Sequence, residues 1–102
     1  MARINEDFVY QILSAVSEIP EGNVATYGQI AKLIGCDKNS RAVGKVLSVA
    51  EMYGEYPCHR VVNSSGRLVP GWENQKELLL NEGVKFRKTG KVDLKDSGWN
   101  IK

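Results

Sequence analysis

The chain is poor in metal-binding side chains, with one histidine and two cysteines among 102 residues. A structural zinc site takes about four Cys or His ligands at characteristic spacings, and the sequence has no CxxC pair. No apolar run approaches the roughly 18 residues that a membrane-spanning helix needs. The amino terminus, MARINEDF, has no signal-peptide pattern. We therefore expect a cytoplasmic protein without a metal or a membrane partner, whose cysteines stay reduced.

Neither sign of charge dominates, since 14 basic and 12 acidic residues give a net charge of +2. That balance is too mild to indicate an anionic partner by itself, so the distribution of charge matters more. One stretch is mostly basic and holds a single acidic residue: Lys32, Asp37, Lys38, Arg41 and Lys45. This stretch could form a positive face for nucleic acid or an ordinary solvated helix surface, and both interpretations stay open.

Length and composition predict one compact domain over residues 1–102, of mixed α/β class and mostly helical. Hydrophobic residues make up 42% and charged residues 25%, which is usual for a globular domain. The first helix is expected over residues 4–20, with Asn5 as its cap and Pro20 at its end. One apolar stripe of this helix should face the core: Phe8, Val9, Ile12, Leu13 and Val16.

Two short helices should follow, joined by a polar turn. Thr26 and Gln29 form a capping-box pattern, and Gly35 ends the first of these helices. The second is expected over residues 40–50, with Arg41 pointing outward. The core-facing residues should be Ile30, Ala31, Leu33 and Ile34 in the first helix, and Val43, Val46, Leu47 and Ala50 in the second. Such a pair indicates a helix-turn-helix, although many helical pairs of this kind never touch DNA.

The second half of the chain predicts two hairpins separated by a helix. RVVNSSGRLV is typical of a tight hairpin, with Asn63, Ser64 and Gly66 providing the turn. Residues 73–83 form the expected helix, ended by Gly83. VKFRKTGKVDL then predicts a second hairpin around a Thr-Gly turn, and Trp99 near the end should dock on the core.

The stretch YPCHRVV places a cysteine, Cys58, directly before the only histidine, His59. A free cysteine is often a small buried hydrophobe, which is the favoured interpretation for Cys36 and stays open for Cys58. Because His59 and Arg60 would favour a thiolate, Cys58 could instead be a nucleophile. Adjacent residues of a strand point to opposite faces, so His59 would reach the sulfur only through a water or a bend after Pro57.

PCHRVV and the segments around it resemble the O6-alkylguanine DNA alkyltransferases, the methylated-DNA–protein-cysteine methyltransferase family. IPEGNVATYGQIAKLIG is similar to the family's stretch that leads into its helix-turn-helix. SRAVGKVL is similar to its recognition helix and KELLLNEG to its final helix. These motifs follow in the family's order and cover about residues 8–83, so the resemblance implies a winged-helix-like DNA-binding domain with short β-hairpins.

The resemblance implies a role for individual residues. Cys58 would accept the alkyl group, His59 would take the thiol proton through a water, and Glu82 would orient His59. Tyr27 would crowd a target phosphate and help to rotate the nucleotide, while Arg41 would fill the vacated space. Further candidates are Ser40, Ala42, Gly44 and Lys45 for DNA contact, and Pro57, Val61 and Trp72 for the substrate pocket.

The function implied is repair of alkylated guanine in double-stranded DNA, bound by base flipping through the minor groove by a monomer. A guanine alkylated on its exocyclic oxygen must leave the duplex before any side chain can reach that carbon. Transfer to Cys58 would form a stable thioether, so each molecule would react once and would need no cofactor.

Three departures from the family favour an alternative. The resemblance begins near the start of the sequence, so we expect no counterpart of the amino-terminal domain of full-length alkyltransferases. SVAEMYGEY has no asparagine where the family has one that braces the active-site turn. LVPGWENQ replaces the family's glycine-rich pocket loop, and its Trp72 would either stack on the extruded base or pack on the core.

The short length, the altered loop and the late Trp99 resemble the alkyltransferase-like proteins. That group binds the same lesions without removing the alkyl group and flags them for nucleotide excision repair proteins. Its acceptor cysteine is typically replaced, whereas this chain keeps Cys58, His59 and Glu82. We therefore expect alkyl transfer, with a non-catalytic lesion sensor as the alternative.

Overall fold

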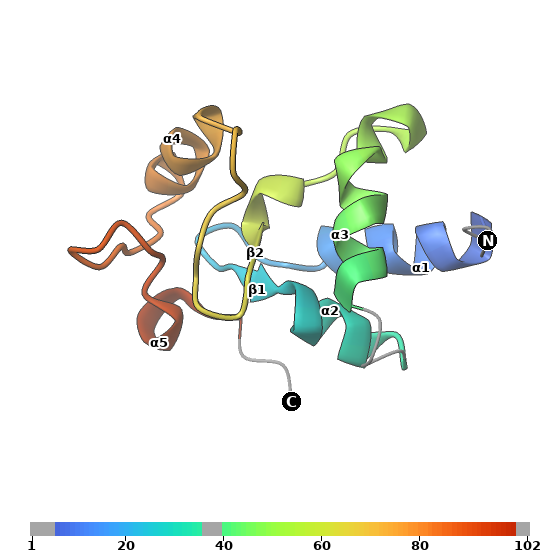
Figure 1. Cartoon of the computed structure of the whole chain (residues 1–102), viewed down its shortest axis with the longest axis horizontal. Coiled ribbons are helices and arrows are strands. Elements are labelled where there is room, and N and C mark those ends of the chain that lie inside the picture. The colour runs from blue at the N-terminus through green and yellow to red at the C-terminus, as the bar shows by residue number, and fades with distance from the viewer. Residues whose placement is uncertain (1–5, 36–39, 100–102) are drawn as a thin grey trace.

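The structure, a computed structural model, describes residues 6–35 and 40–99 and is mainly helical. Figure 1 shows α1, α2 and α3 grouped on one side of the molecule, α4 and α5 on the other, and β1 and β2 between them. The predicted mixed, mostly helical class is confirmed. The expected cap Asn5, together with Cys36 and Lys38, lies outside the described residues.

Helix α1 (Glu6–Ser17) buries the predicted apolar stripe. Val9, Ile12, Leu13 and Val16 are each at most 2% exposed, and Phe8 packs at the edge of the same cluster. The i, i+3, i+4 spacing of these side chains therefore identified the buried face of α1 correctly.

Helices α2 (Tyr27–Leu33) and α3 (Ser40–Ser48) form the predicted pair. The capping box is present, because the Gln29 N–H donates to Thr26 Oγ1 at 3.0 Å and the Thr26 N–H donates to Gln29 Oε1 at 2.9 Å. Helix α3 ends at Ser48, earlier than predicted, and a 3-10 turn, η1 (Ala50–Tyr53), follows it.

Leu33 is a wrong prediction, since 40% of it is exposed. Helix α2 packs through Ile30 and Ala31, which are fully buried, and through Ile34 just beyond its last residue. Successive residues of a helix are about 100° apart, so Leu33 is turned away from Ile34 onto the flank of α2. The predicted inward residues of α3 are confirmed, with Val43 and Val46 fully buried.

The short strands β1 (Ala25–Thr26) and β2 (Val61–Val62) pair in parallel, so the hairpin predicted over RVVNSSGRLV is wrong. Its turn does form, because the Asn63 N–H donates to the Arg67 carbonyl at 3.1 Å, but the chain then leaves β2 without pairing to it. Both valines of β2 are at most 1% exposed. A strand buried on both faces is typical of parallel pairing inside a domain rather than of a surface hairpin.

Helices α4 (Asn74–Asn81) and α5 (Leu94–Ser97) bracket the second predicted hairpin. Gly83 follows α4 with φ +87°, the left-handed conformation that favours glycine at a helix end. Phe86 and Val92 then form an antiparallel bridge. The predicted helix, its glycine stop and the second hairpin are therefore confirmed.

The core consists of two clusters that meet at the β1–β2 pair. One lies among α1, α2 and α3, and the other contains Val24, Val62, Leu79, Val84 and Val92. Trp99 packs on the first cluster, as predicted, and its N–H donates to the Val24 carbonyl at 2.7 Å. A second 3-10 turn, η2 (Cys58–Arg60), immediately precedes β2, so the Cys-His pair lies where the two clusters join.

Candidate functional site

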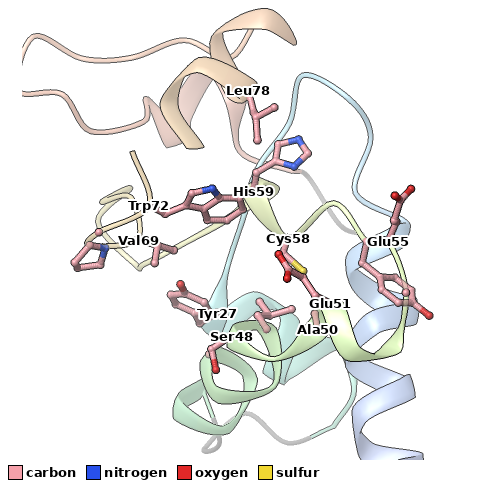
Figure 2. A pocket seen from close by; sticks show the side chains of 16 residues that line it. Tyr27, Ser48, Ala50, Glu51, Glu55, Cys58, His59, Val69, Trp72 and Leu78 are labelled. Atoms are coloured by element: carbon pink, nitrogen blue, oxygen red, sulfur yellow. The ribbon is translucent and has the colours of Figure 1, made fainter. Parts of the chain in front are cut away.

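A cavity of about 970 Å³ opens between α3 and η1 on one side and the loop of residues 69–72 with α4 on the other (Figure 2). Its walls therefore come from both halves of the fold, and η2 lies between them. The lining residues are Tyr27, Gly44, Leu47, Ser48, Ala50, Glu51, Gly54, Glu55, Tyr56, Cys58, His59, Val69, Pro70, Gly71, Trp72 and Leu78.

Cys58 is half-buried and lines this cavity. Burial raises the pKa of its thiol, its own backbone N–H partly offsets that effect, and the nearby negative charge of Glu51 raises the pKa further. The prediction that Arg60 favours the thiolate is wrong, because its guanidinium binds Glu82 instead. The free protein therefore keeps the Cys58 sulfur mainly as a thiol at neutral pH.

His59 and Arg60 both bind the side-chain carboxylate of Glu82. Glu82 is the residue at the C-terminal end of α4. His59 Nε2 lies 2.7 Å from Glu82 Oε2, while Arg60 Nε and Nη2 donate to Oε1 and Oε2, each at 2.9 Å. Burial alone would raise the pKa of Glu82, but the hydrogen bonds from Arg60 and His59 outweigh it and lower this pKa to about 2. An ionised carboxylate only accepts hydrogen bonds, so the proton of neutral His59 lies on Nε2 and Nδ1 is left as an acceptor.

The imidazole and the thiol do not touch each other. Figure 2 shows the His59 ring directed toward Leu78 of α4, away from the Cys58 sulfur. Among the described residues, no hydrogen bond joins these two side chains. A proton could pass between them only through an intervening molecule, so the water predicted from the sequence stays a prediction.

Arg60 also anchors the site to the first cluster, which the sequence did not predict. Its Nη1 donates to the Ile19 carbonyl at 2.9 Å, and its Nη2 lies 3.9 Å from Glu21 Oε1. One guanidinium thus joins the segment after α1, the turn η2 and the end of α4. The sequence offered one signal for this role of Arg60: an arginine directly after the histidine, together with a glutamate at the end of a predicted helix.

Gln75 is a second residue that the sequence analysis missed. It is fully buried, its Nε2 donates to the carbonyls of His59 and Val61 at 3.1 and 3.2 Å, and its Oε1 accepts from the Val69 N–H at 2.7 Å. Gln75 therefore ties the loop of the cavity wall to η2. Gln75 and the buried Leu79 are four residues apart, so both lie on the inner face of α4. This spacing was the sequence signal for the burial of Gln75.

Of the three residues predicted for the substrate pocket, only Trp72 lines the cavity. Trp72 is partly exposed and belongs to neither core cluster, which favours a wall of the cavity over core packing. Val61 is 1% exposed because it lies in β2, where its side chain joins the first cluster. Pro57 precedes η2 with φ −77° and positions the turn without lining the cavity.

Helix α3 presents its basic residues outward and borders the cavity with Gly44, Leu47 and Ser48. Arg41 and Lys45 are exposed, as predicted, while Ser40 and Ala42 are partly buried. Gly44 lines the cavity beside Tyr27, where a β-carbon on Gly44 would lie 3.8 Å from the ring. Helix α3 therefore carries both the exposed basic side chains and part of the lining of the cavity that holds Cys58.

Nothing in the described parts of the chain resembles a metal centre, since residues 6–35 and 40–99 contain no group of three or more His, Cys, Asp or Glu that could hold an ion. No helix in these two segments has the length and apolarity to cross a membrane.

Comparison with known proteins gives one family for most of the chain. The model of the 6-O-methylguanine DNA methyltransferase DNA-binding domain matches residues 7–84. A DNA base-flipping protein of Escherichia coli (strain K12) is 39% identical over 98 residues, which cover 93% of this chain and 76% of that protein. Alkyltransferase-like protein 1 of Schizosaccharomyces pombe is 34% identical over 103 residues, covering 92% of this chain and 95% of that protein.

A methylated-DNA–protein-cysteine methyltransferase of Methanosarcina acetivorans is 40% identical over 80 residues, and the chain spans about half of its length (51%). Among solved structures, S. pombe Atl1 in complex with damaged DNA containing O6-carboxymethylguanine superposes with a TM-score of 0.83 at 30% identity, covering 97% of this chain and 100% of that one. Mycobacterium tuberculosis OGT in complex with DNA gives a TM-score of 0.66 at 34% identity, covering 79% and 52%.

Proposed function

Since the chain belongs to the 6-O-methylguanine DNA methyltransferase family, we propose that it takes an O6-alkylated guanine out of duplex DNA and transfers the alkyl group to Cys58. It acts as a monomeric single domain, in the cytoplasm and without a cofactor. The base-flipping and alkyltransferase-like names of its relatives support the flipping step. The transfer step rests on residues of this chain.

The observation that carries the proposal is that Cys58 lines the same cavity as Tyr27 and Gly44 of the helix-turn-helix. A base that leaves the duplex beside α3 enters that cavity and meets the Cys58 sulfur, which lies between its two walls. The exposed side chains of Arg41 and Lys45 supply positive charge for phosphates or for the vacated space in the duplex. Trp72 offers an aromatic face to the extruded base.

The chemistry assigned to Cys58 is a displacement at the alkyl carbon. The sulfur forms a bond to that carbon while the bond from the carbon to O6 breaks, and the electron pair stays on the base. The thiol proton passes through a water to Nδ1 of His59, and the base takes up a proton to become guanine. Glu82 contributes by holding Nε2–H, which leaves Nδ1 as the acceptor, and by its negative charge beside the imidazolium that forms.

A lesion sensor that recruits nucleotide excision repair proteins is the second candidate. The observation that favours it is the raised pKa of the Cys58 thiol, because a thiol is a much weaker nucleophile than a thiolate. Arg60 also neutralises part of the charge that Glu82 could offer to an imidazolium. Both candidates use the same cavity and differ only in whether a bond to sulfur forms.

The intact mass of the protein after incubation with a duplex containing one O6-methylguanine separates the two. We expect a gain of one methylene group, located on the peptide that contains Cys58, and no gain with the unmodified duplex. Tight binding to the same duplex without any mass gain would establish the sensor instead. Equal binding to modified and unmodified duplexes would contradict both.

Arg41→Ala is expected to weaken binding to the O6-methylguanine duplex about tenfold, because nothing then fills the space that the flipped base leaves. The fold should be unaffected, since the Arg41 side chain is exposed. Fluorescence anisotropy with a labelled duplex measures the affinity. Arg87→Ala removes another exposed arginine, distant from α3 in the chain, and serves as the matched control. Equal affinities of the two variants would remove Arg41 from the mechanism.

A further inference from the structure

The cavity that holds Cys58 has an acidic wall. Glu51 and Glu55 are the only Asp, Glu, Lys or Arg residues among its 16 lining residues. Both glutamates are exposed, and no ion pair of the described residues includes either of them. Their negative charges therefore act on whatever enters the cavity.

Of the two glutamates, Glu51 lies nearer to the Cys58 sulfur. It lies in η1, and Figure 2 shows its carboxylate beside the Cys58 sulfur, with Glu55 farther along the same wall. The electrostatic effect of Glu51 on the thiol, which raises the Cys58 pKa, agrees with this placement. No such effect on Cys58 comes from Glu55, so the two glutamates differ in their distance from the reacting atom.

We propose that Glu51 makes this cavity selective for the charge of the alkyl group, so that negatively charged O6 substituents are bound more weakly than neutral or positively charged ones. The inference rests on the proposed function, because it assumes that the modified guanine enters the Cys58 cavity. It applies to alkyl transfer, in which the alkyl carbon must approach the Cys58 sulfur, and it extends to a sensor that binds the substituent in the same place.

Geometry makes the substituent, rather than the purine, the part that meets Glu51. The first carbon of the alkyl group must approach the Cys58 sulfur, so any charge carried beyond that carbon lies among the groups around the sulfur. Besides Glu51, the residue with an electrostatic effect between it and the Cys58 sulfur is Tyr27, which lines the same cavity. Burial first, and then the charge of Cys58, raises the pKa of Tyr27, so that its phenol stays neutral. Among the described residues that line the cavity, none is a lysine or an arginine that could offset Glu51 or pair with an anionic substituent.

Three duplexes that differ only in the substituent test the proposal: O6-methylguanine, O6-carboxymethylguanine and O6-(2-aminoethyl)guanine. All binding is measured in the Cys58→Ser background, so that no transfer disturbs the equilibrium. We expect the carboxymethyl duplex to bind about tenfold more weakly than the methyl duplex, and the aminoethyl duplex to bind at least as tightly as the methyl one. Adding Glu51→Gln should bring the three affinities to within about threefold of one another.

Two controls isolate the effect of Glu51. Glu55→Gln removes the more distant charge of the same wall. It should reduce the differences in affinity among the three modified duplexes less than Glu51→Gln does. Glu18→Gln removes an exposed charge that directly follows α1 and does not line the cavity. It should leave the differences in affinity among the three modified duplexes unchanged.

The outcomes separate this inference from the proposed function. If all three modified duplexes bind equally well and more tightly than the unmodified one, the lesion is recognised and charge selection is wrong. If Glu51→Gln leaves a tenfold preference intact, Glu51 is not its source. If no modified duplex binds more tightly than the unmodified one, the proposed function itself fails.

Discussion

Replacing Cys58 with serine is expected to abolish the mass gain from an O6-methylguanine duplex and to leave the affinity for that duplex within about twofold. A serine hydroxyl is a far weaker nucleophile than a thiol. The rate should fall by on the order of 10³-fold or more, which is the scale of losing a catalytic nucleophile. Binding should persist because the cavity keeps its other walls.

Mass spectrometry over a time course measures the rate, and anisotropy measures the affinity. Replacing an exposed serine outside the cavity, Ser64→Ala, serves as a control that should leave both unchanged. A Cys58→Ser protein that no longer binds the lesion would indicate that Cys58 has a structural role instead.

The pH dependence of the same reaction follows from the direction of the Cys58 pKa. Burial and Glu51 raise this pKa, so the thiolate is a minor species at neutral pH and grows as the pH rises. The single-turnover rate should therefore increase with pH through the neutral range. Glu51→Gln removes the negative charge that contributes to the raised pKa of Cys58, so it should raise the single-turnover rate at neutral pH.

The fold could be predicted from the sequence where local patterns determined it. The apolar stripe of α1, the capping box of Thr26 and Gln29, and the glycine after α4 all act within a few residues of the chain. The pairing of β2 could not be predicted in this way, because its partner β1 lies more than 30 residues earlier in the sequence. Turn residues after β2 suggested a hairpin, yet the burial of Val61 and Val62 on both faces decides the pairing.

In the site, too, features that depend on neighbouring residues could be predicted, whereas contacts between distant segments could not. Cys58 and His59 stand out because they are adjacent, and the family resemblance added Glu82. The sequence pointed to Arg60 as a partner of the thiolate, since the two are close in the chain. In the 3-10 turn η2 the guanidinium points instead to the end of α4. The i, i+4 spacing from Leu79 could indicate that Gln75 is buried, but its hydrogen bonds to three backbone groups of two other segments could not be predicted from a local pattern.

Arg60→Met is expected to lower the free energy of unfolding by about 3 kcal/mol at neutral pH, the largest stability effect that we expect from a single substitution near the site. Methionine keeps much of the length of the side chain but leaves the Glu82 carboxylate, which is 13% exposed, without its bidentate partner. Removing one member of a buried ion pair costs about 3–5 kcal/mol because the other charge stays buried. The Arg60 side chain is itself 16% exposed, which places the expected value at the lower end of that range.

Urea unfolding measures this effect, and Arg87→Met is the matched control, expected within about 0.5 kcal/mol of the unchanged chain. The double variant Arg60→Met/Glu82→Gln should recover a large part of the loss, because the carboxylate no longer carries an unpaired charge. Additive effects of the two substitutions would show that the ion pair does not stabilise the fold.

Acid provides an independent test of the same ion pair. The pKa of Glu82 in the folded protein is about 2, below its ordinary value of 4.5, so the unfolded chain binds a proton at Glu82 more readily than the folded one. The stabilisation from Glu82 is therefore complete above about pH 5 and is lost as the pH falls toward 2. The gap between 4.5 and about 2 corresponds to about 3 kcal/mol. In Arg60→Met, burial without the arginine should raise the pKa of Glu82, so that this variant loses less stability between pH 5 and 2 than the unchanged chain does.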